Sequence, residues 1–155
     1  MRHWLWIILL FGSLTSFGQS YPTLSDLAKQ YLKALKKQDL NEFRSTYTKD
    51  SILLENFSEN LGFDFAYALE RDFFRVLKEG QQIGIKWNQV KFVKVNFTIS
   101  RDGPFLIAQP TEIIFQHRLF RYSIKMNCSK LKGSWSFVPI ARKRNIIELS
   151  PITHN

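Results

Sequence analysis

The residues that could do chemistry are few in this sequence, and they are scattered along it. Histidine is the side chain that most often transfers protons near neutral pH, and the chain has three. His3 lies in an N-terminal segment that we expect to be removed and His154 in the C-terminal tail, so His117 is the candidate general base. The carboxylate of Glu112 is five residues from it and has the opposite parity in a strand. One histidine also falls short of the about four ligands of a zinc site, so no metal site is predicted.

A catalytic carboxylate paired with a phenol is equally hard to assemble. The part of the chain after Gly80 has three carboxylates, in a predicted turn or at strand ends: Asp102, Glu112 and Glu148. Asp50 and Asp64, at the edges of predicted helices, are further candidates. Four tyrosines could supply the phenol: Tyr31, Tyr47, Tyr67 and Tyr122. The sequence carries no signature of a serine hydrolase, a phosphate loop, a dinucleotide site or a zinc protease. We therefore expect no cofactor and favour binding over catalysis.

The first residues indicate where the protein acts. Arg2 precedes an unbroken apolar run over Trp4–Phe11, and small and polar residues follow over Gly12–Gly18. This order is typical of a secretory signal peptide, with cleavage expected near Gly18. The run is shorter than the about 20 apolar residues of a membrane span. We predict a secreted or periplasmic protein.

The rest of the chain has the size of one domain. We expect a signal peptide over residues 1–18, a single domain over 19–150 and an exposed tail over 151–155. A chain of this length buries enough surface to fold without a covalent staple. The single cysteine, Cys128, has no partner for an intrachain disulfide. Its place in an apolar strand pattern indicates a buried side chain.

Positive charge is concentrated near the C-terminus. The chain carries a formal net charge of +9, and the stretch 113–147 contains eight basic residues and no acidic one. Such a stretch attracts anionic partners, and export favours anionic lipid or acidic glycans over nucleic acid. The alternative is a solvated surface that aids solubility. The residues that we expect to bind an anionic surface are Arg118, Arg121, Lys125, Arg142, Lys143 and Arg144.

Apolar spacing of three and four residues predicts three helices in the first half of the chain. Thr23 and Asp26 have the spacing of a capping box before a helix that begins at Leu24. Asp39 and Glu42 repeat this spacing before a second helix over Leu40–Tyr47. A third helix is predicted over Asp64–Glu79 and is stopped by Gly80. The stretch Ser51–Asn60 fits a strand and a helix equally well.

After Gly80 the apolar period changes to two, which predicts strands. We expect a strand over 93–99, a short strand over 105–108 that Pro110 ends, a long strand over 111–128 and a last strand over 135–139. In the long strand the parity of the apolar residues changes, and a β-bulge near Arg118 and Leu119 would explain the change. The predicted core includes Phe73, Val95, Phe97, Tyr122, Ile124, Trp135 and Phe137.

Two stretches resemble the nuclear transport factor 2-like superfamily, which has a cystatin-like, cone-shaped fold. Residues 27–43 are similar to its opening helix pair, in which an acidic residue restarts the second helix. Residues 133–138, Gly-Ser-Trp-Ser-Phe-Val, are similar to its late Gly-x-Trp strand, and residues 84–87 with 90–93 resemble uncharacterised exported bacterial members. The resemblance implies an α+β fold with N-terminal helices packed on one curved antiparallel sheet. It does not imply one function, because this fold hosts enzymes and non-catalytic modules alike.

The resemblance also suggests where a ligand would bind. Since the sequence offers no assembled catalytic base, we expect a non-catalytic module that recognises a small apolar ligand or a protein partner through the concave face of the sheet. A homodimer through the sheet, as is frequent in the superfamily, is a further expectation. The alternative is a small enzyme of the isomerase or dehydratase type that uses a pocket acid or histidine with tyrosine. The candidate pocket residues are Tyr31, Tyr47, Trp87, Phe115, His117 and Trp135. The other interpretation of such aromatic residues is that they fill the core between helices and sheet.

Overall fold

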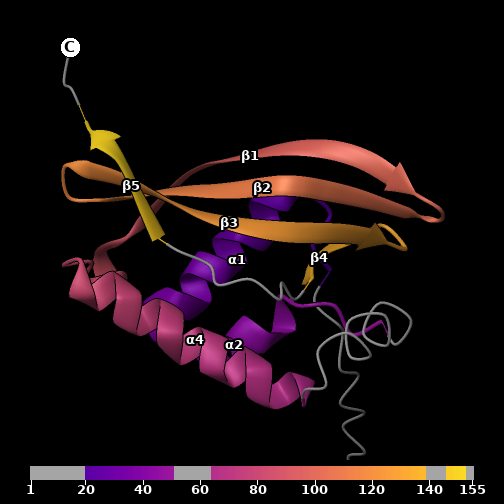
Figure 1. Ribbon diagram of the computed structural model, residues 1–155, viewed down its shortest axis with the longest axis horizontal. Coiled ribbons are helices and arrows are strands. Elements are labelled where there is room, and N and C mark those ends of the chain that lie inside the picture. Colours follow the sequence, from indigo (N-terminus) through magenta and orange to yellow (C-terminus); the bar gives the residue numbers. More distant parts are fainter. Residues whose placement is uncertain (1–19, 51–63, 139–145, 153–155) are drawn as a thin grey trace, which may run out of the picture.

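The fold is a sheet with helices packed on one side of it (Figure 1). The computed structural model describes residues 20–50, 64–138 and 146–152. Within them the chain forms, in order, α1 (Leu24–Lys37), α2 (Leu40–Ser45), α4 (Phe65–Gln82), the 3-10 helix η1 (Trp87–Gln89), β1 (Lys91–Asp102), β2 (Phe105–His117), β3 (Phe120–Leu131), β4 (Ser134–Val138) and β5 (Ile146–Pro151). The predicted signal peptide, the ambiguous stretch 51–60 and the basic residues Arg142, Lys143 and Arg144 lie outside the described residues.

The first two helices begin where the capping pattern predicts. The hydroxyl oxygen of Thr23 accepts a hydrogen bond from the backbone N–H of Asp26 at 3.1 Å, at the start of α1. The carboxylate of Asp39 accepts from the N–H groups of Asn41 and Glu42, both at 2.9 Å, at the start of α2. These side chains satisfy donors that the first turn of a helix leaves unpaired. Helix α2 ends at Ser45, two residues before the predicted end.

Helix α4 begins as predicted, with Asp64 as its N-cap, but it continues through Gly80 to Gln82. Gly80 has a packing role instead of the predicted stop. A Cβ atom at this position would lie 2.4 Å from Cζ2 of Trp87. The indole N–H of Trp87 donates to the carbonyl of Leu77 at 3.0 Å, which fixes the ring against the helix. Glycine is therefore required by the close approach of Trp87.

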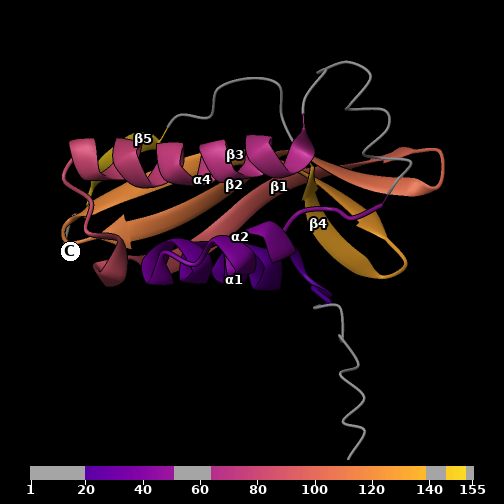
Figure 2. The ribbon, with the colours of Figure 1, turned by 90° about the horizontal axis from the view of Figure 1, so that it is seen from below.

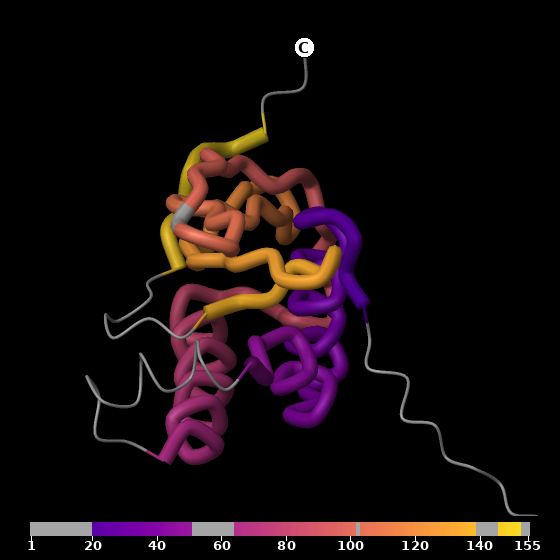
Figure 3. The backbone as a smooth tube through the Cα atoms, turned by 90° about the vertical axis from the view of Figure 1, so that its right-hand side faces the viewer, coloured from indigo at the N-terminus to yellow at the C-terminus, as the bar shows by residue number. Residues whose placement is uncertain are grey.

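The strands form one antiparallel sheet in the order β1-β2-β3-β4. Strand β5 pairs with the first half of β3 and β4 with its second half. Figures 2 and 3 show α1 and α4 on the same side of the sheet, so neither of these two long helices covers its other side, which we call the open side. The predicted fold class, α+β with N-terminal helices on one curved antiparallel sheet, is confirmed.

The predicted strand over 111–128 is wrong, because the chain turns back in its middle. Residues 118 and 119 form a two-residue turn between β2 and β3, and Arg118 has a φ of 54°. A tight turn changes the apolar parity as a bulge does, and the pair Arg-Leu lacks the glycine or asparagine that usually marks such a turn. The predicted end of the preceding strand at Pro110 is also wrong, since β2 runs through it. Pro110 lies at a shift in register between Ala108 and Thr111, a position that spares its missing N–H.

The core lies between the helices and the sheet, and it contains most of the predicted core residues. Five are at most 5% exposed: Phe73, Tyr122, Ile124, Trp135 and Phe137. Val95 is half-buried, and Phe97 is 47% exposed, so its predicted burial is wrong. The turn between β1 and β2 extends past the ends of the helices in Figure 2, which leaves the second half of β1 without cover. Strand β5 was not predicted.

Candidate functional site

The six aromatic and histidine side chains that the sequence proposed for a pocket do not share one cavity. All six are at most 5% exposed. The ring of Tyr31 lies 5.2 Å from the rings of Phe43 and Phe137, centroid to centroid. A second group joins Trp87 to Phe115 at 5.8 Å and Phe115 to Tyr122 at 5.7 Å. These rings pack against one another as the hydrophobic core between the helices and the sheet.

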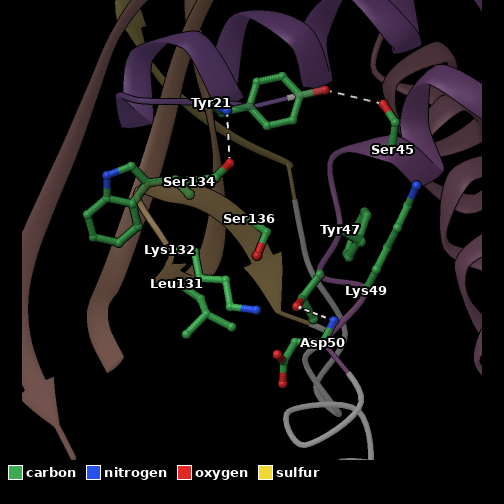
Figure 4. Close-up of a pocket in the computed structure, with 11 residues that line it drawn as sticks. Tyr21, Ser45, Tyr47, Lys49, Asp50, Leu131, Lys132, Ser134 and Ser136 are labelled. Carbon is green, nitrogen blue, oxygen red and sulfur yellow. Dashed lines mark hydrogen bonds between the residues drawn. The ribbon is translucent and has the colours of Figure 1, made fainter. Parts of the chain in front are cut away.

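Two of the six, Tyr47 and Trp135, reach a pocket of about 270 Å³ beside β4 (Figure 4). The N-terminal segment, the chain after α2 and the β3–β4 hairpin contribute its walls. The lining residues are Tyr21, Ser45, Tyr47, Thr48, Lys49, Asp50, Leu131, Lys132, Ser134, Trp135 and Ser136. Tyr31, Trp87, Phe115 and His117 are not among them. We call this cavity the β4 pocket.

Backbone hydrogen bonds hold the walls of the β4 pocket in place. Tyr21 donates its N–H to the hydroxyl of Ser134 at 3.0 Å and accepts at its carbonyl from the N–H of Trp135 at 2.8 Å. Further along β4, the N–H of Phe137 donates to the carbonyl of Thr46 at 2.8 Å, and Thr48 donates back to Phe137 at 2.9 Å. Segments distant in sequence are thereby fixed along one strand, so the pocket is formed before any ligand arrives.

The β4 pocket is lined by hydroxyl groups and by charges of both signs. Its hydroxyls belong to Tyr21, Ser45, Tyr47, Thr48, Ser134 and Ser136, and its charges to Lys49, Lys132 and Asp50. The Tyr21 phenol lies 3.3 Å from the Ser45 hydroxyl. Burial raises the pKa of the Tyr21 phenol, so it keeps its proton at neutral pH. Figure 4 shows Ser136 and Lys132 on the strand side and Asp50 near the lower edge.

His117 lies at the end of β2, whereas the pocket adjoins β4. Its Nε2 atom accepts a hydrogen bond from the backbone N–H of Lys86 at 3.3 Å. Burial, with the positive charges of Arg118 and Lys86, lowers the pKa of its imidazole. The ring is therefore neutral at pH 7, and its accepting nitrogen is occupied by the backbone. In the described residues no group of three or more histidine, cysteine, aspartate or glutamate side chains could hold a metal ion.

A carboxylate that sequence reasoning missed lies beside Tyr47. The phenol of Tyr47 donates to Asp72 on α4 at 3.3 Å. Arg75 forms an ion pair with Asp72 and a second one with Glu79, in which a guanidinium nitrogen lies 3.1 Å from a carboxylate oxygen. The spacing of three and four residues between these side chains was the available signal. The guanidinium of Arg75 bridges the two carboxylates, so the network holds Asp72 in place for Tyr47 and fastens α4 to the chain that follows α2.

The predicted basic residues divide between the β2–β3 turn and the open side of the sheet. Arg118 lies in the turn and is exposed. In the register of β2 and β3, Arg121 lies opposite Gln116 and Lys125 lies opposite Glu112. Their neighbours Tyr122 and Ile124 face the helices, so alternation directs Arg121 and Lys125 to the open side, where both are exposed.

The element order and topology define an α+β fold of the cystatin-like, nuclear transport factor 2-like class, in which helices fill one side of a curved sheet. The chain is similar to the crystal structure of a cystatin-like protein from Ruminococcus gnavus, with a TM-score of 0.52 and 12% sequence identity, over 84% of this chain and 46% of that chain. This likeness concerns the fold alone, and the chain spans less than half the length of that protein. No known family model and no curated protein matches the sequence. Among the described helices, none is long and apolar enough to cross a membrane.

Proposed function

We propose that this protein is a non-catalytic binding module whose ligand site is the β4 pocket. The observation that carries the proposal is a preformed cavity of about 270 Å³ whose walls present hydroxyl groups from three separate segments. Binding sites of this kind fix a ligand through a few convergent polar groups on a rigid frame. The cystatin-like fold is compatible with a binding module and leaves the choice of ligand to the site.

The lining favours a small hydroxylated ligand that carries a negative charge. Serine and threonine hydroxyls both donate and accept, which suits a ligand with several hydroxyl groups. Lys49 and Lys132 outnumber Asp50, so the pocket attracts a carboxylate more strongly than an ammonium group. The half-buried side chain of Leu131 offers apolar surface to the carbon skeleton. A small sugar acid combines these properties.

An apolar ligand on the helix-facing side of the sheet, as the sequence suggested, is the alternative. Phe115 and Ile113 on that side are fully buried beneath the helices, and Ile124 is nearly so. A ligand there would have to displace packed side chains, which costs core contacts before any are gained. We therefore place the ligand in the β4 pocket.

The enzymatic alternative would use the same pocket, because Asp50 and Tyr47 both line it. A working acid–base pair needs a carboxylate within hydrogen-bond reach of the reacting group, oriented by a partner. The Tyr47 phenol donates to Asp72, and that carboxylate is in turn ion-paired with Arg75. Binding without turnover is the simpler consequence of this arrangement.

Thermal shift measurements on the purified protein test the proposal. The panel contains sugar acids, neutral sugars and apolar compounds, because a ligand that binds the folded state raises the melting temperature by mass action. We expect sugar acids to raise the melting temperature of the wild type. This rise should be lost in Ser136→Leu, which fills the pocket, and reduced in Lys132→Gln. Ser100→Leu, an exposed serine on β1, is the matched control and should keep the shift.

Two results would contradict the proposal. A shift caused by apolar compounds and unchanged in Ser136→Leu would place the ligand against the helices instead. Conversion of the bound compound, detected by mass spectrometry and abolished in Asp50→Asn, would establish the enzymatic alternative.

A homodimer through the sheet is a second proposal, and exposed side chains on β1 support it. Strand β1 is an edge strand, and Phe97 and Ile99 are 47% and 49% exposed. Edge strands with exposed apolar residues favour pairing with another strand. Light scattering of the wild type and of Phe97→Lys tests the pairing: a monomeric wild type contradicts it, and a dimer that dissociates in the variant supports it.

Export of the mature protein is a third proposal, based on the signal-peptide pattern of residues 1–18. Intact-mass analysis of the expressed protein should give a mass that corresponds to cleavage near Gly18. Retention of Met1 in a membrane fraction would contradict it.

A further inference from the structure

Exposed apolar side chains gather at the end of the molecule that carries the β2–β3 turn. Leu119 in the turn is 59% exposed, and Phe120, the first residue of β3, is 37% exposed. Leu149 on β5 is 43% exposed, and Ile83 after α4 is 47% exposed. Burying such side chains is favourable, so their exposure on a folded domain points to a surface that is covered on binding.

Long-range contacts bring these residues together from three parts of the chain. The N–H of Ile152 donates to the carbonyl of Leu119 at 2.7 Å, and Phe120 pairs with Pro151. The segment after α4 is joined to the same end through the bond from Lys86 to His117. Figure 1 shows the β2–β3 turn, β5 and the C-terminal end of α4 at the left of the molecule. We call this surface the tip: residues 83–86, 118–121 and 149.

Cations surround the apolar residues of the tip. Arg118 and Arg121 flank Leu119 and Phe120 directly in the sequence, with Arg121 on the opposite face of β3 from Phe120, and both arginines are exposed. Lys86 is exposed nearby, and its charge and that of Arg118 lower the pKa of His117. Among the described residues of this end, Glu79 on α4 pairs with Arg75, and Glu148 on β5, after burial, raises the pKa of Tyr122. The tip is therefore apolar at its centre and positive around it.

We propose that the tip binds anionic lipid bilayers, with Leu119 and Phe120 entering the headgroup region and Arg118 and Arg121 pairing with phosphates. Interfacial binding strengthens with the apolar area buried and with attraction to anionic lipid, and the tip supplies both. Arginine suits phosphate because its planar guanidinium donates two parallel hydrogen bonds. The sequence predicted, from charge alone, a basic surface that binds anionic partners. The structure adds the apolar side chains between the arginines, which distinguish a bilayer from a soluble polyanion.

This surface is separate from the β4 pocket. The pocket adjoins the β3–β4 turn, whereas the tip includes the β2–β3 turn at the other end of β3. Failure of one proposal therefore leaves the other intact, because a variant at either place does not touch the residues of the other.

Co-sedimentation with lipid vesicles tests the proposal, and it uses the chain from residue 19 to residue 155. One set of vesicles contains phosphatidylcholine alone, and the other contains one-third phosphatidylglycerol. We expect binding to the anionic vesicles that weakens as salt rises. Arg118→Gln and Arg121→Gln should each lower the partition coefficient about fivefold. The double variant Leu119→Ser/Leu149→Ser keeps the charge of the protein and should lower the partition coefficient at least as much.

The matched control replaces Tyr67 and Phe74 by serine, because these α4 side chains are 60% and 56% exposed and lie outside the tip. An equal loss of vesicle binding in this control would overturn the proposal. Unchanged binding in the Leu119/Leu149 variant would also overturn it, because the binding would then depend on charge alone. Equal binding to phosphatidylcholine alone would also overturn it. A wild-type dimer that Leu119→Ser dissociates, without vesicle binding, would assign the tip to a second copy of this chain.

Discussion

The helix-facing side of the sheet and its open side are formed by the same strands, yet their side chains differ in kind. On β2 and β3, Ile113, Phe115 and Ile124 face the helices and are at most 1% exposed. On the same strands Arg121 and Lys125 point to the open side and are exposed. Alternation along a strand separates the two sets residue by residue.

This difference indicates where the molecule is stabilised and where it can bind. The packed side contributes stability through apolar burial, and a ligand there competes with the core. The exposed side chains of the open side and of the two ends of the sheet lie outside the core, so their replacement leaves it intact. The β4 pocket and the tip both lie at such ends, which is why we place binding there.

The largest expected effect tests the packed side directly. Phe115→Ala should lower the free energy of unfolding by about 3–5 kcal/mol, because it removes contacts with the rings of Trp87 and Tyr122 and leaves a cavity. Lys125→Ala, three residues along β3 from Tyr122, the partner of Phe115, and on the open side, should change it by no more than about 0.5 kcal/mol. Urea denaturation of both variants measures the difference, and similar values for the two would refute the assignment of the faces.

A somewhat smaller effect is expected where α4 meets Trp87. Gly80→Ala should destabilise the protein by about 1–3 kcal/mol, because the added methyl would lie 2.4 Å from the indole ring. Gln81→Ala, the next and exposed residue of α4, is the control and should have little effect or stabilise slightly. Thermal denaturation of the two variants is sufficient, and a stabilising Gly80→Ala would show that Trp87 has room to move.

Local signals in the sequence predicted the helices well. The caps of α1 and α2 depend on residues three positions apart, and Thr23 and Asp39 perform the roles that their spacing indicates. The period of two after Gly80 predicted the sheet for the same reason, since alternation is a property of a single strand.

Features that depend on distant segments could not be predicted in this way. Phe97 has the same alternating pattern as Val95, but its exposure depends on where the helices end. The β4 pocket depends on the bond from Tyr21 to Ser134, two residues 113 positions apart. Its charged residues, Asp50 and Lys132, have no motif that joins them. The six candidate pocket residues were chosen as aromatic or ionisable side chains, properties that core residues share.

The next prediction concerns pH, because His117 is the buried ionisable group at the edge of the packed side. Its pKa is lowered in the folded protein, so the unfolded chain binds the proton more tightly. Stability is therefore complete above the unfolded value of about 6.5 and declines as the pH falls through it. His117→Gln should flatten this decline between about pH 7.5 and 5.5, because the amide oxygen can accept from Lys86 without titrating. Chemical denaturation at several pH values measures the slope, and equal slopes in both proteins would show that His117 contributes nothing to it.

The smallest expected effect concerns a hydroxyl on the open side of the sheet. Ser123 is fully buried, between Ile114 on β2 and Ile147 on β5 in the register, and its hydroxyl oxygen has no hydrogen-bond partner among the described residues. A buried polar group without a partner costs free energy, so Ser123→Ala should raise the free energy of unfolding by about 1 kcal/mol. Ser150→Ala on β5, where the serine is exposed, is the control and should leave it unchanged. Lys125→Ala, also on the open side, is expected to be neutral. A higher free energy of unfolding in Ser123→Ala would therefore show that the burial of the hydroxyl, and not the side of the sheet, determines its effect on stability. Destabilisation by Ser123→Ala in urea denaturation would contradict this and indicate that the hydroxyl has a partner in solution.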